Sequence, residues 1–142
     1  MTRGGFGSKV HLMTDARGLP IACVLTQGNR NECPVFNQLL DQTLTNTAGV
    51  VPQRLAADRA YNAGAIRTRL AELKIEAVIP PRSSDRPLPY DKPAYRGRNV
   101  IERCVGRLKE MRRIGTRYDK LASSYAAMLT LGMAVLYLRV LT

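Results

Sequence analysis

The chain has 142 residues, which is enough for one domain with a modest core and too few for two. Apolar residues make up 45% of it, which excludes a disordered tail. Lysine and arginine number 22 against 11 acidic residues, and a net charge of +11 favours a polyanionic partner such as nucleic acid. Twelve of those cations and five of the acids lie within residues 82–120, so binding through this segment should depend on salt.

The first elements are predicted by alternation and turn residues. Residues 1–8 are rich in glycine and predict a loop. Residues 9–14 alternate, residues 15–18 form a turn with a glycine, and residues 19–26 form a second strand, so together they predict a β-hairpin. Residues 27–32 are a polar loop. The histidine of the first strand, His11, is expected to face its neighbours in the sheet.

A helix and a strand follow. Pro34 opens the helix, as proline does in a first turn, and one face carries three apolar residues: Val35, Leu39 and Leu40. Residues 54–57 predict a short buried strand that ends at Asp58. Asn62 is placed to cap the next helix, in which apolar residues recur at helical spacing: Ile66, Leu70 and Leu73. Residues 75–79 form another apolar run of strand length.

The last third of the chain combines a basic segment with helices. Residues 80–98 hold five prolines and many arginines, and they predict an exposed basic loop. A helix is expected from about Asn99, then a turn near Gly115, then a terminal helix over residues 125–141. That terminal run is shorter than the roughly 20 residues of a membrane span, so we expect a buried core helix and no membrane partner.

The order β-β-α-β-α-β-α-α predicts a single α/β domain, residues 1–142, with a mixed sheet covered by helices. The cysteines Cys23, Cys33 and Cys104 do not have the spacing of a zinc site, and Cys104 is expected in the core. An odd cysteine count without a signal sequence fits a reducing cytoplasm.

Asp58 stands where a buried strand runs out into a loop, and ligand-binding groups collect at such carboxyl ends in open α/β sheets. A lone aspartate at this place is also a common turn or cap residue. The neighbouring Arg59 and Tyr61 favour a functional role, and both interpretations stay open on the strand alone.

A spaced set of four residues follows, Tyr-x2-Arg-x3-Glu-x6-Lys: Tyr95, Arg98, Glu102 and Lys109. If the helix begins before Asn99, a rotation of about 100° per residue places Arg98, Glu102 and Lys109 within about 40° of one another. Two cations would then flank a carboxylate that binds metal. Glu102 is alternatively a helix-capping residue, because Asn99-x-x-Glu102 fits a capping box. An apolar stripe lies alongside: Ile101, Val105, Leu108 and Met111.

These four residues resemble the glutamate signature of bacterial insertion-sequence transposases of the DDE type. The resemblance extends over essentially the whole chain, and the segments that carry it are residues 3–12 (RGGFGSKVHL), 18–20 (GLP), 57–61 (ADRAY), 99–104 (NVIERC) and 112–121 (RRIGTRYDKL). It implies a ribonuclease-H-like core in which two aspartates and one glutamate hold two divalent cations, Mg²⁺ or Mn²⁺, for hydrolysis and strand transfer of DNA phosphodiesters.

The resemblance also implies roles for single residues. Asp58 matches the family's second aspartate and Glu102 its glutamate, so both are expected to be catalytic metal ligands. Tyr95, Arg98 and Lys109 are expected to contact the transposon end. Three neighbouring cations are also expected to contact DNA: Arg103, Arg112 and Arg113. The resemblance also implies that the active complex is a homo-oligomer, that it binds double-stranded DNA, and that it associates with the nucleoid in the cytoplasm.

The family's first aspartate has no match in the chain. It belongs to a central strand before the hairpin, and Asp15 is the only acid before Glu32. A glycine-containing turn accounts for Asp15. We therefore expect a carboxyl-terminal transposase part that lacks the central strand, either the second of two frames joined by frameshifting or a truncated copy. Both metal ions are expected only after an upstream segment supplies the missing aspartate.

Two functions remain open from the sequence. The chain is either a catalytic fragment, inactive and marginally stable alone, or a non-catalytic DNA-binding remnant or inhibitor of transposition. An RNA-binding module is disfavoured because no aromatic stacking platform is visible among two Phe and six Tyr.

Overall fold

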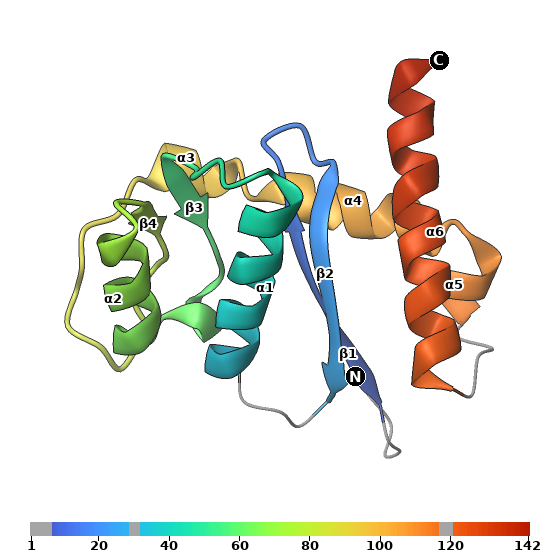
Figure 1. Cartoon of the computed structure of the whole chain (residues 1–142). Coiled ribbons are helices and arrows are strands. Elements are labelled where there is room, and N and C mark those ends of the chain that lie inside the picture. Colours follow the sequence, from blue (N-terminus) through green and yellow to red (C-terminus); the bar gives the residue numbers. More distant parts are fainter. Residues whose placement is uncertain (1–6, 29–31, 117–120) are drawn as a thin grey trace. The chain divides into compact units, whose positions relative to one another are not determined.

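The computed structural model describes residues 7–28, 32–116 and 121–142 (Figure 1). Most of the expected loop at residues 1–8, and part of the one at 27–32, lie outside them. The elements in chain order are β1 (Ser8–Thr14), β2 (Pro20–Gln27), α1 (Glu32–Asn46), β3 (Arg54–Ala56), η1 (Arg59–Tyr61, a 3-10 turn), α2 (Gly64–Glu72), β4 (Glu76–Val78), α3 (Lys92–Arg96), α4 (Asn99–Lys109), α5 (Arg112–Thr116) and α6 (Ala122–Leu141).

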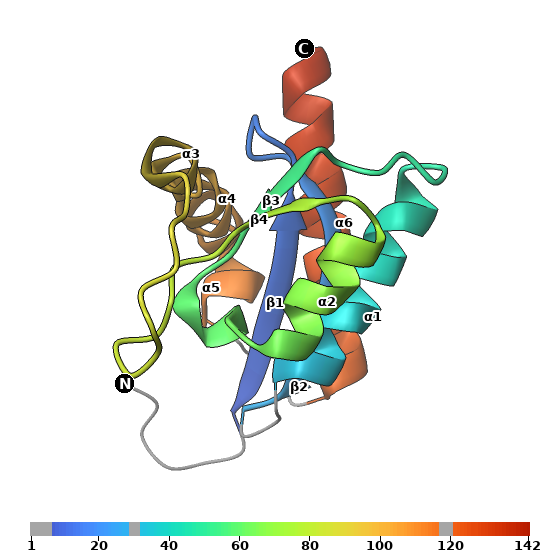
Figure 2. The same ribbon diagram turned by 90° about the vertical axis from the view of Figure 1, so that its left-hand side faces the viewer.

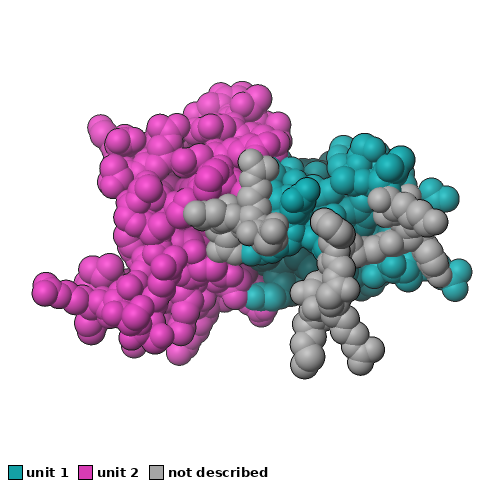
Figure 3. Space-filling model, turned by 90° about the horizontal axis from the view of Figure 1, so that it is seen from below, with its two compact units in different colours: residues 1–30, 100–142 teal, residues 31–99 magenta. Residues whose placement is uncertain are grey.

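The chain forms two compact units (Figure 3). Unit 1 comprises residues 1–30 and 100–142, and unit 2 comprises residues 31–99. The mixture of helices and small sheets agrees with the expected α/β class. Among the described residues the strands form two sheets of two strands each, β1 with β2 and β3 with β4.

The hairpin of unit 1 is confirmed. β1 pairs with β2 in antiparallel register, and His11 lies opposite Val24. The His11 ring is buried and its Nε2 lies 3.1 Å from the Thr26 hydroxyl, so this histidine faces its neighbours in the sheet as expected. Gly18 has a φ of 83°, a left-handed conformation that glycine adopts without strain, and it closes the turn between the strands.

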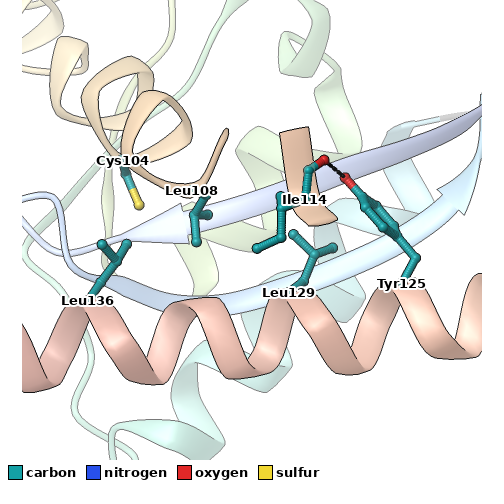
Figure 4. Close-up of a cluster of buried hydrophobic side chains, with 6 residues drawn as sticks. All are labelled: Cys104, Leu108, Ile114, Tyr125, Leu129 and Leu136. Atoms are coloured by element: carbon teal, nitrogen blue, oxygen red, sulfur yellow. Dashed lines mark hydrogen bonds between the residues drawn. The ribbon is translucent and has the colours of Figure 1, made fainter. Parts of the chain in front are cut away.

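The core of unit 1 lies between α4, α5 and α6 and is shown in Figure 4. Its buried residues are Cys104, Leu108, Ile114, Tyr125, Leu129 and Leu136. Side chains of the hairpin pack against this cluster, among them Val10 and Cys23. Burial, reinforced by the nearby Cys104, raises the pKa of the Cys23 thiol to about 11, so this thiol stays protonated at neutral pH. The expected core position of Cys104 is confirmed.

Helix α6 packs closely at a glycine. A Cβ on Gly132 would lie 2.6 Å from the Ile114 Cδ1 atom and 3.0 Å from the Met111 sulfur, so a larger residue would force these side chains apart. The expectation of a buried terminal helix was wrong for the face of α6 that points away from this core. Leu131, Leu138 and Leu141 are 57%, 60% and 81% exposed, because unit 1 offers the helix one packing face only.

The last turns of α6 project beyond the hairpin (Figure 1). Among the described helices, α6 alone is long and apolar enough to cross a membrane by length and composition. Core helices of soluble proteins, which are mostly buried, meet the same criteria, whereas 22% of the α6 window is buried, along the stripe that packs in unit 1.

Unit 2 is built on a parallel strand pair. β3 and β4 lie side by side (Figure 2), with Leu55 opposite Ala77. Helix α2 buries Ile66 and Leu70, and the buried face of α1 carries four apolar residues: Val35, Phe36, Leu39 and Leu40. The strands predicted at residues 54–57 and 75–79 are therefore confirmed, each slightly shorter than expected.

Two segments differ from the sequence prediction. Residues 92–96 form helix α3 inside the expected loop, because the Asp91 carboxylate accepts a hydrogen bond from the Ala94 amide at 2.9 Å and Pro93 suits a first turn. Gly115 lies within helix α5, where its amide donates to the Met111 carbonyl at 2.9 Å. Residues 117–120, which follow, are outside the described residues.

Candidate active site

Asp58 lies two residues beyond the end of β3, in unit 2, where the sequence placed it. Its Oδ1 atom accepts a hydrogen bond from the Ala60 amide at 2.9 Å and caps η1. Its Oδ2 atom has no hydrogen-bond partner among the described residues. The side chain is half-buried at a strand end, and a carboxylate oxygen with an open lone pair suits a hard cation such as Mg²⁺. The cap interpretation and the ligand interpretation thus apply to different oxygens.

The expected capping role of Asn62 was wrong. Helix α2 has Ala63 at its N-cap position, with no side-chain hydrogen bond there. Asn62 is instead 9% exposed and bonds to two side chains, Arg67 and Asp85. A buried amide with long-range partners was not visible in the spacing of the sequence.

Tyr95 and Arg98 are brought together. The Arg98 guanidinium carbon lies 5.6 Å from the centre of the Tyr95 ring, within the range of a cation–π contact. The Tyr90 ring meets the Tyr95 ring edge-on, with 5.7 Å between centres. Tyr90 was not among the sequence-predicted residues, and it gives Tyr95 a second contact.

Helix α4 carries Glu102, Arg103 and Lys109, all exposed. Two residues separate it from α3, and their amides donate to carbonyls of α3, Gly97 to Ala94 and Arg98 to Tyr95. Helix α4 itself begins at Asn99, and the two residues before it form a turn. The predicted apolar stripe packs inward: Leu108 is buried, and three others are half-buried, Ile101, Val105 and Met111. Glu102 lies in the first turn of α4, and its metal-ligand role remains a prediction.

Arg112 and Arg113 form the first turn of α5 and are exposed, while the next residue, Ile114, is buried in the core of unit 1. Helix α5 is thus anchored in the core by Ile114 and presents both arginines to solvent. Their assignment to DNA contacts remains a prediction.

Asp15 serves the hairpin turn. Its Oδ1 accepts from the Leu19 amide at 2.8 Å and from the Arg17 amide at 2.9 Å, and its Oδ2 accepts from the Arg17 guanidinium at 3.1 Å. Partial burial acts to raise the pKa of Asp15, but these hydrogen bonds and the Arg17 charge outweigh it and leave the pKa below its ordinary value. The turn accounts for both oxygens, as the sequence predicted.

The two expected metal ligands belong to different units, Asp58 to unit 2 and Glu102 to unit 1. Over residues 7–28, 32–116 and 121–142 there is no group of three or more His, Cys, Asp or Glu side chains that would hold a metal ion. Each carboxylate separately has the oxygen chemistry that Mg²⁺ and Mn²⁺ prefer.

The comparisons with known proteins point in one direction. Residues 2–137 match the model of a family described as the transposase DDE domain. A protein of Brucella ovis named as a transposase for insertion sequence element IS6501 is 34% identical over 136 residues, which cover 93% of this chain and 98% of that protein.

A second relative, from Burkholderia cepacia, is named as a transposase for insertion sequence element IS402. It is 33% identical over 135 residues, which cover 92% of this chain. The chain spans 62% of the length of that relative. The family match over nearly all residues, and the relative matched almost end to end, show that the chain belongs to the transposase DDE domain family.

Proposed function

We propose that this chain carries two of the three carboxylates of a transposase active site, with Asp58 and Glu102 as metal ligands. The observation that carries the proposal is the position of Asp58 at the end of a parallel strand, with one oxygen used in a cap and the other open. Membership of the DDE domain family supports the assignment of both acids. Two ions, Mg²⁺ or Mn²⁺, bind only when the third carboxylate is present.

The proposal includes a ribonuclease-H-like domain in which both units take part and a central strand comes from an upstream segment. The two-stranded sheets support it, since among the described residues β1 pairs only with β2, and β3 only with β4. An added strand would enlarge these two-stranded sheets into the mixed sheet that the proposal requires. The same segment would supply the first aspartate.

The DNA-contacting residues are proposed to be Tyr95, Arg98, Arg103, Lys109, Arg112 and Arg113. The contact between Tyr95 and Arg98 supports a joint role at the transposon end, because an arginine held over a ring keeps its donors in a fixed plane for phosphate. The active complex is proposed to be a homo-oligomer that acts in the cytoplasm on nucleoid DNA.

The chemistry divides between the cations and the protein. Bound divalent cations supply activation of the attacking oxygen and neutralisation of charge at the phosphate. The Asp58 and Glu102 carboxylates would hold the cations, and Arg98 and Lys109 would bind DNA phosphates. The isolated chain holds DNA but does not transfer strands.

The test is metal-dependent nicking of a matched transposon end by the chain joined to its upstream segment. Asp58→Asn and Glu102→Gln should each lower nicking by about 100-fold or more, because each removes a charged ligand. Asp58→Asn keeps an oxygen for the Ala60 amide, so the η1 cap survives. Glu110→Gln is the matched control, since Glu110 is an exposed acid directly after α4 and should leave nicking unchanged.

Two results would overturn the proposal. Nicking by the isolated chain would show that no upstream carboxylate is required. Full nicking by Glu102→Gln would leave Glu102 only a capping role, with a loss of about 0.5–2 kcal/mol in unfolding free energy. A joined protein that binds ends and never cleaves them would favour the non-catalytic remnant or inhibitor.

A further inference from the structure

A buried amide in unit 2 has both of its polar ends satisfied by distant side chains. The Asn62 Oδ1 atom accepts from the Arg67 Nε at 2.7 Å, and its Nδ2 donates to the Asp85 Oδ2 at 2.7 Å. The side chain of a buried asparagine is costly unless such partners are present. Asn62, Arg67 and Asp85 therefore form a network, which we call the Asn62 network.

The Asn62 network ties two segments of chain together. The Arg67 Nη2 donates to the Ile79 carbonyl at 2.7 Å, and the Asp85 Oδ2 also accepts from the Arg82 amide at 3.1 Å. Ile79 directly follows β4, while Asn62 follows η1 at the end of β3. The network thus joins the chain beyond β3 to the chain beyond β4, at the carboxyl ends of both strands.

Asp58 lies on the short stretch between this network and the sheet. Just before it, the Ala57 amide donates to the Val78 carbonyl of β4 at 3.3 Å. Just after it, the Tyr61 amide donates to the Asp58 carbonyl at 3.1 Å, and Asn62 is the C-cap residue directly after η1. The backbone around Asp58 is consequently fixed at one end by the sheet and at the other by the Asn62 network.

A ring contact holds the same stretch from another side. The Tyr61 and Phe36 rings lie with 5.8 Å between their centres, and Phe36 is buried in α1. This contact restrains η1 but does not orient the polar side chains that follow it. The Arg67 guanidinium orients them, because its planar fork donates to a side-chain oxygen and a backbone oxygen at once.

We infer that Asn62, Arg67 and Asp85 are positioning residues that hold the Asp58 carboxylate in the geometry of a metal ligand. The inference rests on the proposed function, in which Asp58 binds Mg²⁺. It assigns these residues no contact with metal or DNA. Their effect is transmitted through η1, as outer hydrogen-bond partners of metal ligands commonly act.

The first experiment needs only the chain as it is. Arg67→Met keeps the length of the side chain and removes the fork, and Arg69→Met is the control. Arg69 lies in the same helix but forms exposed ion pairs with Asp41 at 3.5 Å and Glu72 at 3.9 Å. We expect Arg67→Met to speed hydrogen exchange of the Tyr61 and Asn62 amides by about 10-fold or more, and Arg69→Met to leave it unchanged.

Asp85→Ala is the second variant, because Asp85 is exposed and its loss should not prevent folding. Asp85→Ala should speed hydrogen exchange of the Tyr61 and Asn62 amides by a smaller factor than Arg67→Met does. Arg67→Lys keeps a cationic donor, so exchange of these amides should be slower than in Arg67→Met. Unchanged exchange in both Arg67→Met and Asp85→Ala would overturn the inference.

The second experiment uses the chain joined to its upstream segment. Arg67→Met should raise the Mg²⁺ concentration for half-maximal nicking by about 10–100-fold, with less effect on the rate at saturating Mn²⁺. A purely structural role would instead lower the rate at every metal concentration. Arg69→Met should match the wild type.

The two proposals fail in different ways. If Asp58→Asn abolishes nicking while Arg67→Met leaves the Mg²⁺ requirement unchanged, the positioning role is wrong and the proposed function stands. If Asp58→Asn leaves nicking intact, the proposed function is wrong and the positioning role falls with it, whatever the exchange result.

Discussion

Glu102 in unit 1 stands on a helix whose other face packs into an apolar cluster, whereas Asp58 in unit 2 sits in a loop held by hydrogen bonds. Apolar packing is non-directional, so it positions helix α4 as a whole, and Glu102 is placed by the position of that helix. Hydrogen bonds are directional and fix a particular turn of backbone. Glu102 should therefore respond to volume changes in the core, and Asp58 to the loss of single polar partners.

The largest effect is expected from emptying the core of unit 1. Leu136→Ala removes a side chain that is 1% exposed and should lower the free energy of unfolding by about 2–5 kcal/mol. Leu138→Ala, on the same helix at 60% exposure, is the control and should change it by less than about 0.5 kcal/mol. Denaturant unfolding measures both. Equal losses would show that the exposed face of α6 is packed in solution.

A smaller effect is expected at a polar contact of unit 2. Asp91→Ala removes the N-cap of α3 and should cost about 0.5–2 kcal/mol in unfolding free energy, with weaker helicity around Tyr95. Asp91→Asn retains the cap oxygen and loses only the exposed ion pair to Arg54, 3.4 Å away, so it should cost less. If Asp91→Asn lowered the unfolding free energy as much as Asp91→Ala, the ion pair rather than the cap would stabilise α3.

The smallest effect concerns charge in the hairpin turn of unit 1. Asp15→Asn keeps an acceptor oxygen and removes the pair with Arg17, which is 74% exposed, so at pH 7 it should cost less than about 1 kcal/mol. The pKa of Asp15 is lowered in the folded chain, so its contribution is present above the ordinary value of 3.8 and is lost as the pH falls through the lowered value.

Unfolding of both proteins across this pH range measures the difference. The wild type and Asp15→Asn should converge in stability at acid pH. If the difference in unfolding free energy between the wild type and Asp15→Asn persisted or grew at acid pH, the charge of Asp15 would not be what stabilises the turn.

The sequence predicted the elements that depend on neighbouring residues. The hairpin followed from alternation and a glycine turn, and α4 from its apolar stripe, because both patterns are local. Helix α3 was missed because its cap at Asp91 lies among prolines that favour a loop. Asp58 and Glu102 were singled out by the family pattern, since a single acid at a strand end or a helix start has common structural uses.

The partners of Asn62 had no signal in the sequence for a physical reason. Its hydrogen bonds connect it to residues 5 and 23 positions away, and the Arg67 bond to Ile79 spans 12 positions. The separations of 12 and 23 positions are bridged only in the folded chain, where β3 and β4 pair in parallel. Local preference therefore assigned Asn62 to the nearest helix start, and tertiary contacts overrode it.

The span of the Asn62 network has a consequence for synthesis of the protein. Its last member, Asp85, lies 27 positions after Asp58 in the chain. During translation the hairpin has all its residues early, whereas the network cannot close until Asp85 has left the ribosome. A nascent chain that stops before that point has Asp58 in its sequence but lacks the bonds that hold η1. The loop around this carboxylate thus reaches its final geometry late, after the residues that form it have been made.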